Sequence, residues 1–264
     1  MKSIIITGAT SGIGLSLTKS MAKKGYKIIM ACRNTIKAEK IKCDIIESSG
    51  NRNISVVYLD LEKEGTIKAF IKIIEAECKN IDILVNNAGV FEDKSLEING
   101  IEKTMYINFY ATRKLTEGLL PLICTEGKII NIVSKAGLYG ELSSKLINNK
   151  KKFKGFRAYS ASKLALILYT RKLAQRLNDD KHIKVYAVHP GAVATNIWRG
   201  SSLLMKIIKP IMKLTSKKPE EAIDTIEYII DNNLESNFYG DRKVILLGEK
   251  AKNPETYTNY KNLV

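Results

Sequence analysis

Short apolar runs alternate with longer amphipathic stretches along most of this chain, and this alternation restricts its fold more than any other feature. A short apolar run is typical of a strand that is buried on both faces, whereas apolar residues at helical spacing are typical of a helix that covers a sheet. Strands that alternate with helices in this way build a parallel sheet with helices on both faces. The pattern therefore predicts an α/β fold.

The predicted elements follow one another throughout the chain. Strands are expected at residues 3–7, 27–31, 54–58, 83–85, 128–133, 184–189 and 243–247. Helices are expected at residues 12–24, 35–48, 63–78, 101–119, 158–177 and 219–232. Two stretches, 138–155 and 199–218, fall outside the alternation. Because long connections beside such a sheet usually shape a ligand cleft, we interpret 138–155 as an inserted loop and 199–218 as a substrate lid.

Composition narrows the class of protein further. With 264 residues, of which 45% are hydrophobic and 27% charged, the chain can bury one sizeable core, and we interpret residues 1–264 as a single domain. The formal net charge of +16 raises the question of a polyanionic partner. The basic residues are scattered from Lys2 to Lys261 and do not form a patch, so we favour a solvated basic surface and expect no nucleic-acid partner.

Cysteine and histidine usage argues against metal binding and secretion. The four cysteines form no C-x-x-C pair and lie mostly in apolar or amphipathic patterns, which favours reduced thiols and a cytoplasmic location. His182 and His189 have no partner at ligand spacing, so no metal site is expected. No run reaches the length of a membrane span, and the first strand begins too close to Met1 for a signal peptide. We therefore expect a soluble protein.

The first predicted strand leads through a glycine-rich turn, T-G-x-x-x-G-x-G, directly into a helix. The free N–H groups and the helix dipole at such a turn attract a dinucleotide pyrophosphate, although a purely structural turn is the alternative. Gly8 permits the tight turn, Gly12 lets the backbone approach the phosphates, and Gly14 allows close helix packing. The cofactor contacts expected here are Thr7, Gly8, Ser11, Gly12, Ile13 and Gly14.

The second predicted strand ends at Cys32-Arg33-Asn34, where an NAD enzyme would place an acid against the ribose 2′-hydroxyl. Arg33 instead offers a guanidinium that suits a 2′-phosphate, and the absence of a nearby carboxylate would remove the repulsion that this phosphate meets. A solvent-exposed arginine is the alternative interpretation. We favour NADP(H), with Arg33 and Asn34 among its contacts.

Two further loops at strand ends are predicted to reach the same cofactor. Asp60 and Leu61 follow the third strand, and Asn87, Ala88 and Gly89 follow the fourth. The Asp60 carboxylate could accept a hydrogen bond from the adenine amino group or could cap the next helix, and the sequence leaves both roles open. The small residues after the fourth strand would let the backbone lie against the cofactor.

Tyr159 and Lys163 stand at positions i and i+4 of a predicted helix, so their side chains share one face. A phenol has an ordinary pKa of about 10, which a neighbouring ammonium lowers. Tyr159 could then exchange a proton with a substrate oxygen while a hydride moves at the adjacent carbon, and Lys163 could also reach the nicotinamide ribose. Ser134, at the end of the fifth strand, would hydrogen-bond the same substrate oxygen.

The order of these motifs resembles the short-chain dehydrogenase/reductase family. The resemblance rests on Thr7–Gly14, Asn86–Gly89, Asn108, Ser134, Tyr159–Lys163 and Pro190-Gly191. It implies a single Rossmann-type domain, a doubly wound parallel sheet of about seven strands with helices on both faces. It also implies a catalytic tetrad of Asn108, Ser134, Tyr159 and Lys163, in which Asn108 holds a water that relays protons to Lys163. The loop after residue 189 resembles the segment that closes over the nicotinamide, with contacts from Pro190, Gly191, Val193 and Thr195.

Within that family the chain is most similar to the retinol dehydrogenase-like group, which includes the oxidoreductase domain of WW-domain oxidoreductases. The residues that carry this similarity are Ala31-Cys32-Arg33, 158–165, 188–191 and an apolar segment after Arg199, together with the long interval from Ser134 to Tyr159. Many of those enzymes have an N-terminal membrane anchor that we do not expect here. Membrane residence and retinoid turnover are therefore not implied.

An apolar lid would favour a lipophilic small-molecule substrate, such as an aldehyde, a ketone, or a retinoid- or steroid-like compound. Residues 203–213 of this stretch pair apolar side chains with lysines, so a core helix and a peripheral membrane contact are the alternatives. The expected activity is NADP(H)-dependent hydride transfer. A non-catalytic NADP(H)-binding sensor or scaffold is the alternative, against which the complete tetrad argues. Members of the family are often dimers or tetramers, so a homo-oligomer is a further open outcome.

Overall fold

The computed structural model describes residues 1–143, 153–178, 182–191, 193, 217–248, 254–261 and 263. The predicted contact Thr195, the segment 203–213 and most of the predicted lid 199–218 lie outside the described residues. The middle of the predicted inserted loop, 144–152, lies outside them as well. In the described part of the chain, no helix is both long enough and apolar enough to cross a membrane.

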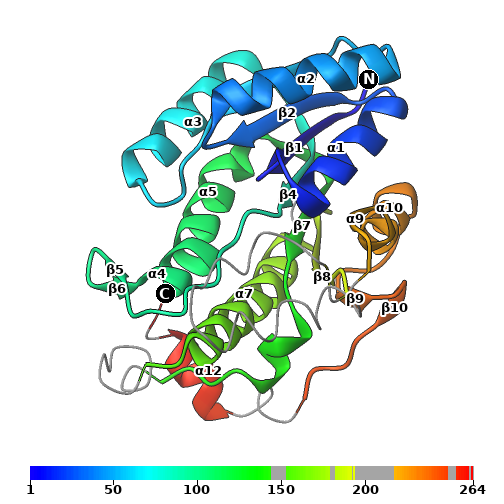
Figure 1. Ribbon diagram of the computed structural model, residues 1–264. Coiled ribbons are helices and arrows are strands. Elements are labelled where there is room, and N and C mark those ends of the chain that lie inside the picture. Colours follow the sequence, from blue (N-terminus) through cyan, green and yellow to red (C-terminus); the bar gives the residue numbers. More distant parts are fainter. Residues whose placement is uncertain are drawn as a thin grey trace.

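Strands and helices alternate along the described chain (Figure 1). The strands are β1 (Ser3–Thr7), β2 (Lys27–Cys32), β3 (Ile54–Tyr58), β4 (Ile81–Asn86), β5 (Glu97–Ile98), β6 (Ile101–Glu102), β7 (Ile123–Ile132), β8 (Lys184–His189), β9 (Phe238–Gly240) and β10 (Lys243–Val244). The α-helices are α1 (Gly12–Lys23), α2 (Thr35–Ser49), α3 (Glu64–Glu77), α4 (Lys103–Met105), α5 (Thr112–Leu119), α7 (Gly155–Asn178), α9 (Pro219–Ala222), α10 (Asp224–Asp231) and α12 (Pro254–Lys261). The other helical segments are the π-helix η1 (Tyr106–Ala111) and the 3-10 helices η2 (Leu120–Leu122) and η3 (Lys135–Tyr139).

Among the described residues, the main sheet has eight strands in the order β10-β9-β8-β7-β4-β1-β2-β3. Every neighbouring pair is parallel except β9 and β10. The chain builds outward from β1 to β3 and then returns to place β4 on the other side of β1. In such a doubly wound sheet, the loops that leave β1 and β4 turn to opposite faces, and ligands bind in the crevice between them.

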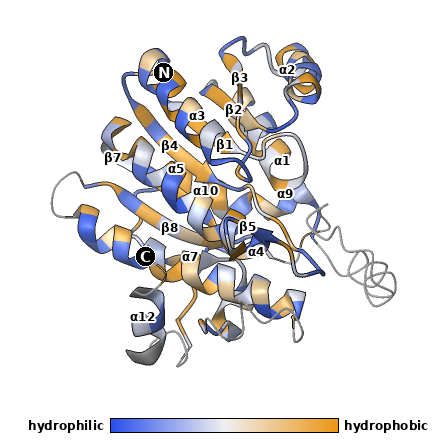
Figure 2. Cartoon of the chain, turned by 90° about the vertical axis from the view of Figure 1, so that its left-hand side faces the viewer, coloured by the Kyte–Doolittle hydropathy of each residue, from blue (hydrophilic) through white to orange (hydrophobic). Residues whose placement is uncertain are grey.

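A separate core fills each face of the sheet. Ile4 and Ile6 belong to the core that also includes residues of α1, α2 and α10, while Ile5 belongs to the core that includes residues of α3, α5, α7 and α12, and all three isoleucines are fully buried. Burial on both faces is why the strands are apolar at nearly every position. Figure 2 shows this contrast, since the central strands are coloured hydrophobic and the helices carry hydrophilic residues on their outer sides.

Polar residues end β1 on both sides of its isoleucines. At the start, the Ser3 backbone N–H donates to Asp82 Oδ2 at 2.7 Å, and the Ser3 hydroxyl donates to the same oxygen at 2.9 Å. At the end, Thr7 Oγ1 donates to the Val85 carbonyl at 3.4 Å. Both ends of β1 are therefore held to β4 by side-chain hydrogen bonds as well as by the backbone pairing of the two strands.

The predicted α/β architecture is confirmed, but several elements differ from the prediction, and β7 begins at Ile123 instead of residue 128. The helix expected at 101–119 begins only at Lys103, because residues 97–102 form the β5–β6 hairpin and the Glu102 carboxylate caps the backbone N–H groups of Thr104 and Met105. The parallel strand beside β8 is β9, not the expected strand 243–247, of which only the antiparallel Lys243–Val244 is formed. A tight turn at Asp241 and Arg242, both with positive φ, joins these two strands.

Candidate active site

A cavity of about 980 Å³ lies along the carboxyl edge of β1, β2, β4, β7 and β8. The residues of the sequence prediction that line it are Thr7, Gly8, Ser11, Gly12, Ile13, Arg33, Asn34, Asp60, Leu61, Asn87, Ala88, Gly89, Ser134, Tyr159, Lys163, Pro190, Gly191 and Val193. Gly14 and Asn108 are not among the lining residues. Loops from both halves of the sheet thus line this cavity, which is large enough to hold a dinucleotide and leave further space beside it.

The glycine-rich turn between β1 and α1 has the expected geometry. Gly8 and Gly12 adopt positive φ values of 68° and 51°, which other residues rarely adopt. A Cβ on Gly14 would lie 2.4 Å from the Gly8 carbonyl oxygen, so α1 can approach the turn only because this residue has no side chain. Ser11 is the N-cap of α1, but its side chain makes no capping hydrogen bond. The first-turn N–H groups are therefore free to bind an anion.

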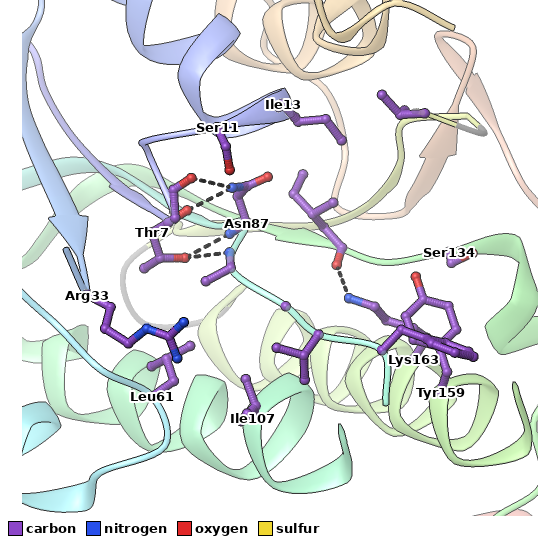
Figure 3. A pocket seen from close by; sticks show the side chains of 18 of the residues that line it. Thr7, Ser11, Ile13, Arg33, Leu61, Asn87, Ile107, Ser134, Tyr159 and Lys163 are labelled. Atoms are coloured by element: carbon purple, nitrogen blue, oxygen red, sulfur yellow. Dashed lines mark hydrogen bonds between the residues drawn. The ribbon is translucent and has the colours of Figure 1, made fainter. Parts of the chain in front are cut away.

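Thr7 and Asn87 fasten this turn to the loop after β4. The backbone N–H groups of Asn87 and Ala88 both donate to Thr7 Oγ1 at 2.9 Å, and Asn87 Nδ2 donates to the Thr7 carbonyl at 2.8 Å (Figure 3). The sequence predicted backbone contact with a cofactor here and did not predict this side-chain bridge. Thr7 and Asn87 shape the cavity wall by holding its two loops together.

Arg33 is exposed, as the alternative interpretation expected, and a carboxylate lies beside it. Arg33 Nη1 is 3.1 Å from Glu62 Oε1, and Lys103 Nζ is 3.3 Å from the same oxygen. The expectation that no carboxylate lies near Arg33 is therefore wrong, because Glu62 is distant in the sequence but close in the folded chain. Glu62 comes from the loop after β3, and the parallel pairing of β2 with β3 brings the ends of both strands to one edge. That pairing is the signal that would have predicted the contact.

Asp60 does not cap the next helix, which begins at Glu64 with Lys63 as its N-cap. Its carboxylate instead accepts a hydrogen bond from the Glu62 backbone N–H at 3.1 Å and so forms a tight turn on the cavity wall. The N-cap alternative is thereby excluded, and contact with adenine stays a prediction. Asn34 does act as an N-cap, because its Oδ1 accepts from the Lys37 N–H at 2.9 Å at the start of α2.

Tyr159 and Lys163 lie on one face of α7, as predicted, and both are almost fully buried. Lys163 Nζ donates to the Ile132 carbonyl at 2.9 Å and lies 5.8 Å from the centre of the Tyr159 ring (Figure 3). Burial raises the pKa of Tyr159 to about 12, and a hydrogen bond with Ser134 offsets only part of that effect. Burial also lowers the pKa of Lys163 to about 8.

The expectation that Lys163 holds the pKa of Tyr159 below its usual value is therefore not met in this structure. The reason is that loss of water around the phenol outweighs its hydrogen bond to Ser134, while the ammonium of Lys163 is directed at Ile132. Phe91 contributes to this burial, since its ring packs edge-on against the Tyr159 ring at 5.7 Å between centroids.

Ser134 follows β7 and is the N-cap of η3, where its hydroxyl oxygen accepts from the Ala136 N–H at 3.2 Å. It faces the Tyr159 hydroxyl at the same end of the cavity (Figure 3). This short helix after β7 fixes Ser134 against α7, because a Cβ on Gly137 would lie within 3.0 Å of the Lys163 and Leu164 backbone. The predicted serine and tyrosine are thus brought together as two hydroxyl groups on one side of the cavity.

Asn108 lies in the π-helix η1 and is almost fully buried. Its Oδ1 accepts from the Val90 N–H at 2.8 Å, and its Nδ2 donates to the Val90 carbonyl at 2.9 Å and to Ser162 Oγ at 3.0 Å. Both amide hydrogens are therefore engaged. The side chain therefore ties the loop after β4 to α7, and the water that the family resemblance implies at Asn108 stays a prediction.

Several residues that the sequence analysis did not single out also line the cavity. The apolar ones are Val90, Phe91, Ile107, Ala136 and Phe156, and the charged ones are Lys37, Glu62, Glu92 and Lys103. His189 ends β8 at the cavity wall, where burial lowers its pKa to about 4 and keeps it neutral near pH 7. Most of these residues follow strand ends, but only the folded arrangement shows which of them meet.

A glycine-rich turn under an open helix N-terminus and a Ser-Tyr-Lys group at one cavity define a nicotinamide-dependent oxidoreductase of the doubly wound class. The model of the short chain dehydrogenase family matches residues 2–203, and the chain belongs to that family. Retinol dehydrogenase 12 of Mus musculus is 32% identical over 261 residues, which cover 97% of this chain and 82% of that protein. Retinol dehydrogenase 13 of Homo sapiens is 34% identical over 238 residues, 86% of this chain and 71% of that protein. The predicted similarity to the retinol dehydrogenase-like group is confirmed.

Solved structures with the same fold cover nearly the whole chain. An uncharacterized protein from Mycobacterium paratuberculosis superposes with a TM-score of 0.78 and 23% identity, over 100% of this chain and 91% of that one. Salutaridine reductase from Papaver somniferum gives a TM-score of 0.71 and 21% identity, over 91% of this chain and 100% of that one. At these identities the two structures support the fold.

Proposed function

We propose that this protein uses NADP(H) to move a hydride between the nicotinamide and the carbonyl or alcohol carbon of a lipophilic substrate. The observation that carries the proposal is one cavity with Ser134, Tyr159 and Lys163 at one end and the open N-terminus of α1 with Arg33 at the other. The substrate class comprises aldehydes, ketones, and retinoid- or steroid-like molecules. Asn108 is a positioning residue in this proposal, because its side chain lies behind the cavity wall.

The residues present fit a nicotinamide dinucleotide. The first-turn N–H groups of α1 suit its pyrophosphate, and Gly14 lets α1 approach the turn at Gly8 so closely that an added Cβ would clash with the Gly8 carbonyl oxygen. When bound, the cofactor supplies or accepts the hydride. Tyr159 Oη then gives a proton to the substrate oxygen during reduction, or takes one during oxidation, while the Ser134 hydroxyl holds that oxygen in place.

Lys163 supports this chemistry with its charge. With a pKa of about 8, its ammonium remains largely protonated at pH 7, so that a positive charge lies beside the phenol ring. This charge stabilises the phenolate relative to the phenol when Tyr159 gives up its proton. The buried, partly apolar surroundings of both residues strengthen that interaction and keep water away from the proton.

Arg33 supports the preference for NADP(H). The fold itself does not decide the cofactor, since a short-chain dehydrogenase from Sphingobium yanoikuyae was solved with NADPH and a 3-ketoacyl reductase from Brucella melitensis with NADH. A guanidinium at the end of β2 offers paired donors that match the oxygens of a 2′-phosphate, whereas it would bind an uncharged ribose 2′-hydroxyl only weakly. Arg33 therefore sets the preference in this proposal.

Apolar side chains around Tyr159 support a lipophilic substrate. Val90, Phe91, Ile107 and Phe156 line the cavity, and the Phe91 ring packs against the proposed proton donor. Phe156 is 55% exposed, so the rim of the cavity remains apolar where it meets water. A substrate with an extended hydrocarbon part would bury these side chains on binding. The retinol dehydrogenases among the relatives bear names that agree with such a substrate.

A screen of NADPH oxidation against aliphatic and aromatic aldehydes, ketones, retinaldehyde and steroids tests the proposal. We expect turnover of at least one lipophilic carbonyl compound by the wild type. In Tyr159→Phe, which keeps the ring and its packing against Phe91, turnover of that compound should fall by at least about a hundredfold, while NADPH binding changes little. Turnover by Tyr159→Phe at a rate near that of the wild type would refute the assigned proton donor.

A further inference from the structure

Four charged side chains form one connected cluster where the cavity passes the ends of β2 and β3. Glu62 Oε1 lies 3.1 Å from Arg33 Nη1 and 3.3 Å from Lys103 Nζ, and Lys103 Nζ lies 3.2 Å from Glu92 Oε1. All four residues line the cavity. Two cations and two carboxylates give the cluster no net charge. As it stands, the cluster therefore offers little attraction to a phosphate.

We propose that the Glu62 carboxylate holds the place of the cofactor's 2′-phosphate, and that NADP(H) binding exchanges this carboxylate for the phosphate as the partner of Arg33 and Lys103. The inference rests on the proposed preference for NADP(H). It adds two specificity residues, Glu62 as an internal competitor and Lys103 as a second ligand of the phosphate. Lys103 precedes η1 and is far from Arg33 in sequence, so sequence patterns did not connect them.

The geometry suits such an exchange because a single oxygen of Glu62 contacts both cations. The position between Arg33 and Lys103 is therefore one that an anionic oxygen can occupy, and a phosphate oxygen has the same charge and acceptor chemistry. The side chain of Glu62 is 30% exposed, so it can turn toward water when displaced. Its backbone stays in place, since the Glu62 N–H donates to Asp60 Oδ1.

Lys103 is held ready for a ligand by its second partner. Its side chain is only 19% exposed, and Glu92 would keep it in place after Glu62 withdraws. Burial alone would lower the pKa of Lys103, but the hydrogen bonds and charges of Glu92 and Glu62 raise it, so the ammonium stays protonated. NAD(H) carries no 2′-phosphate and leaves the pair of Glu62 with Arg33 intact. Removing the Glu62 charge should therefore favour NADP(H) alone.

Equilibrium titrations of the full chain with NADP⁺, NAD⁺ and the fragment adenosine 2′,5′-bisphosphate test the exchange. In Glu62→Gln we expect NADP⁺ and the fragment to bind roughly three- to tenfold more tightly, with less than about a twofold change for NAD⁺. In Lys103→Met we expect NADP⁺ and the fragment to bind about tenfold more weakly. Glu64→Gln is the matched control, because this carboxylate pairs with Lys68 and Lys114 outside the cavity.

Two results would overturn the exchange. One is unchanged or weaker NADP⁺ binding by Glu62→Gln, and the other is weaker NAD⁺ binding by that variant, which would make Glu62 an acceptor for the ribose 2′-hydroxyl. A wild type that prefers NAD⁺ contradicts the proposed function itself, whereas a wild type that prefers NADP⁺ without a gain in Glu62→Gln contradicts only the exchange. Circular dichroism reports folding of each variant, and if Lys103→Met does not fold, the Glu62→Gln titration alone decides.

Discussion

At the scale of single residues, the candidate site combines side chains that the sequence could identify with pairings that it could not. Tyr159, Lys163 and Ser134 follow from helical spacing and a strand end, and the structure brings them to one end of the cavity. The contact of Glu62 with Arg33 was not predicted, because the two residues lie in different loops that only the pairing of β2 with β3 brings together. The hydrogen bonds of Asn108 to Val90 and Ser162 could not be predicted either, because they join the loop after β4 to α7 only in the folded chain.

Replacing Arg33 tests the cofactor preference at the residue that carries it. The wild type should bind NADP(H) more tightly than NAD(H), and Arg33→Asp should reverse that order, because the new carboxylate repels a 2′-phosphate and accepts from a ribose hydroxyl. We expect NADP(H) affinity to fall by at least about tenfold in titrations of both cofactors. Arg33→Lys is the control, because it keeps the positive charge and loses the paired donors of the guanidinium. A reversal in Arg33→Lys as complete as in Arg33→Asp would show that charge is not the cause.

The buried ammonium of Lys163 should make stability depend on pH. Its pKa is about 8 in the folded protein, against about 10.4 in an unfolded chain. Because the folded value is the lower one, burying the charge destabilises the fold fully below pH 8, and this penalty disappears as the pH rises toward 10.4. Relative to Lys163→Met, the wild type should gain on the order of 3 kcal/mol in free energy of unfolding over that range.

Urea denaturation of the wild type and Lys163→Met across that pH range measures the effect. Other groups titrate in both proteins, so the difference between them isolates Lys163. A difference that stays constant from pH 7 to 10.5 would mean that the lysine is not desolvated. Lys163→Met should also lose turnover at every pH, which would separate the role of this residue in catalysis from its cost to stability.

At the scale of elements, the long apolar and amphipathic segments were predictable, and the short ones were not. The β5–β6 hairpin was missed although Asn99-Gly100, both with positive φ, is a strong hairpin signal. Helix α12 was missed because its sequence is polar, although Tyr260 lies in the buried core. Both segments are short and contain few apolar residues, so their periodicity carried little information.

Lys128 on β7 anchors the carboxyl end of α10, and its removal should detach that helix end. Its Nζ donates to the carbonyls of Ile229, Ile230 and Asn232 at 2.8 to 2.9 Å, where a helix presents unpaired acceptors and negative dipole. We expect Lys128→Met to lower the free energy of unfolding by about 2–3 kcal/mol. Urea denaturation measures this loss.

Lys184 offers the matched control for that prediction. It is the register partner of Lys128 on β8, but it pairs with Glu235, whose side chain is 84% exposed. Lys184→Met should therefore cost less than about 1 kcal/mol. Equal losses in Lys184→Met and Lys128→Met would show that the three carbonyls contribute no more than a surface ion pair does.

At the scale of the whole molecule, the doubly wound order places the cavity between two halves of the sheet. Loops after β1, β2 and β3 line it from one half, and loops after β4, β7 and β8 line it from the other. This arrangement could be predicted, because strands that alternate with helices leave few topologies and put ligand contacts at the carboxyl edge. Strand order alone could not say which charged side chains of the two halves would meet.

A ligand that bridges both halves should stabilise the entire fold. With NADPH at about a hundred times its Kd, linkage predicts a gain of about 2.7 kcal/mol, which raises Tm by roughly 5–10 °C in a chain of this size. Thermal unfolding with NADPH, with NADH and without either measures this gain. NADH at the same concentration should raise Tm less. Equal shifts with both cofactors would argue against the NADP(H) preference without any assay of turnover.

The polar ends of β1 have a consequence for how the chain finds its place in the sheet. Ile4, Ile5 and Ile6 are identical, and both faces of the strand are apolar, so a slip by one residue would exchange isoleucine for isoleucine and cost these contacts little. The Ser3 hydroxyl cannot be exchanged in this way, because it meets the Asp82 carboxylate of β4 at only one alignment, and Thr7 adds a hydrogen bond to the Val85 carbonyl at the other end. The alignment of the central strand is therefore set by the polar residues at its two ends, and Thr7, at the second end, also lines the cavity.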